Sequence, residues 1–132
     1  SGPHGGVASV CRSDAIRRRV SFEGREVVEY GCSLGLGPVH ARLEGATVVN
    51  SISNEPNDAQ VGERAVEFFG VDQVSFFMCD GKGFPCEKSK GAIGLALSIN
   101  ANESNWDKVR EVLSGCSIIV RRTRHGVDYI ES

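Results

Sequence analysis

The chain lacks the sequence features that mark most zinc sites, membrane spans and phosphate-backbone binders. None of its five cysteines lies three positions from another, the C-x-x-C spacing by which a tight turn aims two thiolates at one zinc ion. Its apolar runs fall far short of the roughly 20 residues needed to cross a bilayer. With 15 basic and 17 acidic residues the net charge is −2, and the basic excess typical of nucleic-acid binders is absent.

What is present suits one small globular domain. The length is 132 residues, with 40% hydrophobic and 24% charged residues, which argues against disorder. We interpret residues 1–6 as a tag remnant or disordered tail and residues 7–132 as a single domain. No apolar signal segment precedes the domain, and five unpaired thiols suit a reducing compartment, so we expect a cytoplasmic location, with the nucleus as a further option.

The first half of the chain alternates apolar and polar residues, which predicts strands. Residues 17–22 and 25–33 flank the turn signal Glu23-Gly24 and predict a β-hairpin. Residues 39–43 and 46–52 predict two further strands. The first half therefore reads as an antiparallel meander.

The second half mixes helical and strand patterns. Residues 58–69 predict a helix with Asp58 as N-cap and Gly70 just past its end. A second helix is expected to begin after Ser104 and to end at Gly115. Strands are expected at 73–79, 91–99, 117–121 and 127–130. The predicted fold class is α+β, a mainly antiparallel sheet of about six strands, meander first, packed with two α-helices.

No motif completes a metal or cofactor site. Asp80-Gly81-Lys82-Gly83 begins like a calcium loop, but a cation stands where that loop needs an oxygen ligand. Gly35-Leu36-Gly37 lacks the third glycine of a dinucleotide loop and precedes a strand-like pattern, which indicates a turn. We therefore expect no catalytic residues, no metal and no cofactor.

Two alternatives depend on particular residues. A small Cys/His-dependent enzyme would pair Cys79 or Cys86 with a histidine, for which the chain offers His4, His40 and His125. An RNA-binding domain would use the arginine clusters Arg17–Arg19 and Arg121–Arg124. The near-neutral total charge makes nucleic acid the weaker of these interpretations.

The apolar strands favour a protein-binding function. Residues 74–78 and 92–97 are apolar throughout most of their length, and two short helices would not cover both faces of the sheet. We expect a partner chain to cover the rest, so that the protein is half of a dimer. The expected partner-binding residues are Lys82, Phe84, Arg121, Arg122 and Arg124.

One stretch resembles a known family. The apolar strand 91–99, a polar break, a helix through residues 109–113 to Cys116 and the tail Ser117-Ile118-Ile119-Val120 resemble the C-terminal unit of the small proteasome assembly chaperones. This resemblance implies a non-enzymatic chaperone without a cofactor. It also implies a homologous small subunit and proteasome α-subunits as partners, and no membrane association.

Overall fold

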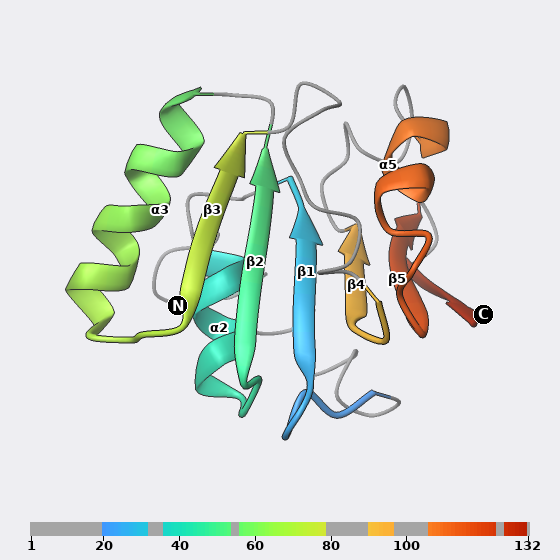
Figure 1. Cartoon of the computed structure of the whole chain (residues 1–132), viewed down its shortest axis with the longest axis horizontal. Helices are drawn as coiled ribbons and strands as arrows, with labels where there is room; N and C mark the ends of the chain where they lie inside the picture. The colour runs from blue at the N-terminus through green and yellow to red at the C-terminus, as the bar shows by residue number, and fades with distance from the viewer. Residues whose placement is uncertain are drawn as a thin grey trace.

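The structure is a computed structural model, and it describes residues 20–31, 36–53, 56–78, 90–96, 106–123 and 126–131. Within these ranges six strands and three helices alternate along most of the chain (Figure 1). In chain order they are β1 (Glu26–Tyr30), α2 (Leu36–Leu43), β2 (Val48–Ser53), α3 (Pro56–Phe69), β3 (Val74–Met78), β4 (Ile93–Ala96), α5 (Trp106–Val112), β5 (Ile118–Thr123) and β6 (Gly126–Glu131). None of these helices is long and apolar enough to span a bilayer.

The sheet is mostly parallel, so the predicted antiparallel α+β fold is wrong. Its strand order is β3-β2-β1-β4-β5-β6, and only the pairing of β5 with β6 is antiparallel. Parallel neighbours need long crossover connections, which are usually helical and place helices on the sheet faces. The architecture is therefore a doubly wound α/β sheet with one antiparallel strand at its edge.

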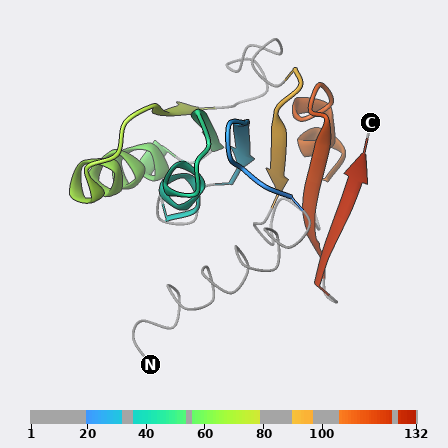
Figure 2. The ribbon, with the colours of Figure 1, turned by 90° about the horizontal axis from the view of Figure 1, so that it is seen from below.

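Helices cover both faces of this sheet (Figure 2). α2 and α3 lie on one face and α5 on the other. The core on the α2 face includes Val27, Val49 and Ile93, while the core on the α5 face includes Val28, Ile52 and Leu113. Successive strand residues point to opposite faces, and both faces of β1 are covered by core side chains. For this reason β1 is buried at every position after Glu26.

The region predicted as the strand 39–43 is instead helix α2. Val39, Ala41 and Leu43 alternate with polar residues in a way that suits a strand, yet these positions form a helix in which Val39 and Ala41 are buried. An eight-residue helix is barely two turns long, so its periodicity is hard to separate from alternation.

The predicted hairpin before it is also wrong. The turn at Glu23-Gly24 is present, with Gly24 at φ 71° and the Arg25 N–H donating to Phe22 O at 3.0 Å. Residues 20–22, the described part of the predicted first strand, do not pair with β1, whose two neighbours are β2 and β4. Val20 and Phe22 pack into the core on the α2 face instead.

Helix α3 matches its prediction apart from its start. Its end is confirmed, because Gly70 has φ 67° and the Val71 N–H donates to Val66 O at 3.2 Å. Asp58 was expected as N-cap but lies inside the helix, which begins at Pro56. The strand that follows α3, β3, is apolar through most of its length, yet it is half-exposed at the sheet edge.

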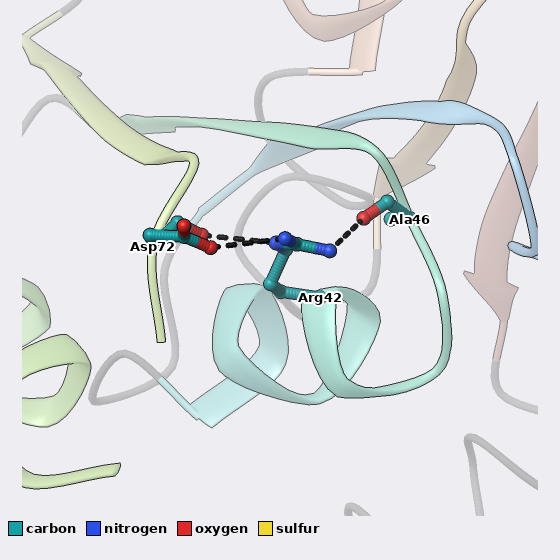
Figure 3. A network of polar contacts seen from close by, with 3 residues as sticks. All are labelled: Arg42, Ala46 and Asp72. Atoms are coloured by element: carbon teal, nitrogen blue, oxygen red, sulfur yellow. Dashed lines mark hydrogen bonds and ion pairs between the residues drawn. The ribbon is translucent and has the colours of Figure 1, made fainter. Parts of the chain in front are cut away.

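Arg42 joins three segments at the edge of the sheet where the strands begin (Figure 3). From the end of α2 its Nη1 donates to Ala46 O at 2.8 Å, and its Nε donates to Asp72 O at 3.0 Å. Its Nη2 lies 2.9 Å from Asp72 Oδ1. The guanidinium thereby fixes α2 against the chain that leads into β2 and the chain that leads into β3.

We predict that Arg42→Met lowers the free energy of unfolding by about 1–3 kcal/mol, because two backbone carbonyls lose a charged donor. Asp72→Asn should change it by less than about 0.5 kcal/mol, since the Asp72 side chain is 76% exposed and exposed ion pairs contribute little. Urea titrations of both variants measure the difference. Equal losses in the two variants would contradict the assignment of the stabilisation to the backbone carbonyls.

Candidate functional site at the carboxyl edge of the sheet

The parallel strands end together along one edge of the sheet (Figure 1). β1 and β4 lie side by side there, and the chain leaves them toward opposite faces, to α2 from β1 and to α5 from β4. In doubly wound sheets ligands bind at this switch point, outside the carboxyl ends of the strands. The candidate site therefore lies where β1 ends and α2 begins.

A glycine-rich connection joins β1 to α2. Gly31 follows β1 directly with φ 85°, a conformation that favours glycine, and its N–H donates to Ile52 O at 2.7 Å. Gly35 and Gly37 follow in the sequence, and α2 begins at Leu36. Gly35-Leu36-Gly37 was interpreted as a turn before a strand, and this is wrong because Leu36 and Gly37 open a helix.

Glu29 lies beneath the first turn of α2. Its side chain points to the α2 face, and a Cβ added at Gly37 would lie 2.8 Å from Glu29 Cδ, so any larger residue at position 37 would have to displace the Glu29 carboxyl. Glu29 is 3% exposed, and its Oε1 has no hydrogen-bond partner among the described residues. Burial raises the pKa of the Glu29 carboxyl to about 8.

Ser51 on β2 stands beside Glu29. The two are register partners in adjacent parallel strands, so both side chains point to the α2 face. Ser51 is 1% exposed, and its Oγ also has no partner within the described part of the chain. Buried polar atoms are usually satisfied by protein, water or ligand, so two such oxygens in adjacent strands make this edge a candidate binding site.

Only two of the expected partner-binding residues are described. Arg121 lies on β5, with its guanidinium carbon 4.0 Å from the ring centroid of Trp106. The backbone of Arg122 belongs to the same strand and pairs with Val127 of β6. Lys82, Phe84 and Arg124 lie outside the described residues, as do Arg17–Arg19 of the other arginine cluster.

The Cys/His alternative gains no support from the described residues. Cys116 is buried, and burial raises the pKa of its thiol to about 12, the opposite of an activated nucleophile. His40 lies on α2 rather than on a strand, and its Nδ1 is 3.8 Å from Glu44 Oε1. The remaining candidates, Cys79, Cys86, His4 and His125, fall outside the described ranges. No cluster of three metal-ligating side chains occurs among the residues that are described.

Comparison with known proteins identifies the fold. No protein-family model and no curated protein sequence matches the chain. Coclaurine N-methyltransferase bound to N-methylheliamine and SAH matches with a TM-score of 0.63, 13% identity, and coverage of 86% of this chain and 36% of that one. A candidate RNA methyltransferase from Pyrococcus horikoshii matches with a TM-score of 0.70 and 15% identity, over 86% of this chain and 55% of that one. The [4+2]-cyclase SpnF matches with a TM-score of 0.69 and 18% identity, over 86% of this chain and 44% of that one.

These matches correct the earlier expectations. The chain shares a Rossmann-like fold with structures that include several methyltransferases, so the resemblance to proteasome assembly chaperones is wrong. The expected non-enzymatic chaperone of α+β class is wrong with it, because the proteins that share this fold include methyltransferases and a cyclase. The chain spans 36 to 55% of the length of the three structures described.

The raised pKa of Glu29 predicts a pH-dependent stability. The carboxyl has a reference pKa of 4.5 and a folded value of about 8, so the folded state holds the proton more tightly. The favourable contribution of the protonated carboxyl is therefore fully present below pH 4.5. As pH rises from 4.5 to 8 it is lost, which lowers the free energy of unfolding by an amount on the order of 5 kcal/mol. Glu29→Gln should remove this loss, so the free energy of unfolding of the variant should rise relative to that of the parent between pH 5 and pH 8.

Urea midpoints at four pH values across that range measure this difference. Glu26→Gln is the matched control, because Glu26 begins the same strand and is exposed. A stability difference between Glu29→Gln and the parent that stays constant with pH would contradict a protonated Glu29.

Proposed function

We propose that the chain is the cofactor-binding part of an S-adenosylmethionine-dependent methyltransferase. One observation carries the proposal. At the switch point of a doubly wound sheet, Gly37 in the first turn of α2 lies against the buried carboxyl of Glu29, whose Oε1 has no partner among the described residues. The fold alone would not suffice, because folds host many activities and SpnF, a cyclase, shares this one.

The residues present suit such a cofactor. S-adenosylmethionine carries an ammonium and ribose hydroxyls, all hydrogen-bond donors, and Glu29 Oε1 and Ser51 Oγ are acceptors that lack partners within the described ranges. The cofactor's carboxylate is an anion, and the start of a helix such as α2 favours anions. When bound, the cofactor supplies a methyl group on a sulfonium, which is a strong alkyl donor.

The chain's own contribution is to bind and orient. Gly31 and Gly37 allow the backbone to pass close to a ligand, and Gly37 leaves room for the Glu29 carboxyl beneath the helix. The structures that share the fold are longer than this chain, and under the proposal their additional length corresponds to acceptor-binding parts. Under the proposal, this chain binds the cofactor, and parts like the additional length of those structures help to select the methyl acceptor.

The proposal predicts binding of S-adenosylhomocysteine that depends on Gly31. Gly31→Ala should raise the dissociation constant roughly tenfold or more, which corresponds to about 1.4 kcal/mol of lost binding. The reason is that alanine disfavours φ 85° by about 1–2 kcal/mol, so the connection shifts where the ligand would lie. Isothermal titration calorimetry of the parent and the variant measures it.

Gly70→Ala is the matched control. Gly70 has a similar φ of 67°, but it lies past the end of α3, at the opposite edge of the sheet. Both variants should lose similar stability, while only Gly31→Ala should lose ligand affinity. Failure of the parent chain to bind S-adenosylhomocysteine would reject the proposed function, and equal affinity losses in both variants would reject the proposed location of the site.

A further inference from the structure

Glu29 carries the only carboxyl group at the described ends of β1, β2 and β4. Its side chain is buried, and neither its Oε1 nor the Oγ of the neighbouring Ser51 has a hydrogen-bond partner within the described ranges. Gly37 in the first turn of α2 lies against the same carboxyl. An acid is therefore held between the start of a helix and the edge at which doubly wound sheets bind ligands.

The elements packed against Glu29 supply no counter-charge for it. β2 and β4 contain no titratable side chain, and no ion pair found among the described residues includes Glu29. On α2, Arg42 is bound to Asp72 at the opposite edge of the sheet, and His40 Nδ1 lies 3.8 Å from Glu44 Oε1. Burial raises the pKa of Glu29 to about 8, so the free chain holds a proton there at neutral pH.

We infer that the ammonium group of the cofactor ionises Glu29 when it binds, so that this site selects ligands with a positive charge and releases a proton on binding them. The inference rests on the proposed function, because it concerns the same site. The proton passes from the carboxyl to the solvent, and the ammonium keeps its own protons. The product is an ammonium–carboxylate pair, and no bond of the ligand breaks.

The charges around the site complement an α-amino acid group. A buried carboxylate is costly unless a cation pairs with it, so a cationic ligand stabilises the ionised form of Glu29. The start of α2 lies against the same carboxyl and favours an anion. The ammonium and the carboxylate of an α-amino acid are attached to one carbon, so both can be met at these two neighbouring places. A neutral nucleoside would meet neither.

Affinity for S-adenosylhomocysteine should therefore rise with pH, because the ligand favours the ionised form of Glu29. An adjacent opposite charge lowers the pKa of a carboxyl by roughly 1–3. Starting from about 8, this corresponds to a rise in affinity of roughly 3- to 100-fold between pH 5 and pH 7.5. At pH 7 about 0.4–0.9 of a proton should be released for each ligand bound.

Isothermal titration calorimetry measures both quantities. At each pH the titration is made in two buffers of different ionisation enthalpy, and the difference in heat counts the protons released. 5′-Methylthioadenosine is the matched ligand, because it keeps the adenosine and the thioether but lacks the amino acid group. Its affinity should stay constant with pH, and it should release no proton. This comparison of two ligands needs only the parent chain.

Glu29→Gln should abolish the proton release and leave an affinity for S-adenosylhomocysteine that is constant with pH. Glu26→Gln is the matched control, since Glu26 is exposed at the start of the same strand, and it should keep both properties of the parent. A pH dependence that survives in Glu29→Gln would assign the proton to another group, such as His40, and would overturn the inference.

The outcomes separate this inference from the proposed function. If S-adenosylhomocysteine binds with an affinity that is constant or falls as pH rises, the inference is wrong and the proposed function stands. If 5′-methylthioadenosine releases as many protons, the assignment to the ammonium is wrong. If S-adenosylhomocysteine binds at no pH, the proposed function fails, and the inference fails with it.

Discussion

The parallel pairing of β1 on both of its sides is the constraint on which the rest of the structure depends. β1 lies between β2 and β4, and Val27 and Val28 are fully buried on opposite faces. A strand in this position needs apolar cover above and below, and parallel neighbours can be reached only by crossovers that supply such cover. The same requirement brings the carboxyl ends of five strands to one edge. The position of the candidate site is thus a consequence of how the core is closed.

Glu29 places a carboxyl among the buried residues of β1 and is the clearest mark of the candidate site. Its side chain is 3% exposed and its Oε1 has no partner among the described residues, which costs stability, because burial disfavours the charged form of the carboxyl and this oxygen loses water. Replacement by a hydrophobic residue would remove this cost. Gly37 leaves space for the carboxyl by having no side chain. A local cost at one position, accommodated by the residue above it, is typical of a binding site.

Sequence patterns located most elements but could not give their pairing. The apolar segments that became β2, β4 and β5 were recognised, as was the helix before Gly70, because burial leaves a direct trace in composition. Parallel and antiparallel neighbours bury the same residue types, so composition does not reveal the direction of a strand. The direction follows only from the helical crossovers, and α2 was too short to be distinguished from a strand. The site was missed for the same reason, since Gly31 and Glu29 gain meaning only when a helix follows them.

The hydrogen bonds that fix the strand starts lie at the edge of the sheet opposite the candidate site. At the edge where strands begin, Arg42 joins the chain before β2 to the chain before β3, and Arg25 Nη2 donates to Ser117 Oγ at 2.7 Å and to Gly91 O at 3.3 Å, ahead of β5 and β4. These bonds fix the strand starts without any contribution from the carboxyl edge. Residues at the carboxyl edge are therefore free to change with the ligand while the sheet persists. Since ligands of doubly wound sheets bind outside the carboxyl ends of the strands, such a separation lets one architecture host different activities.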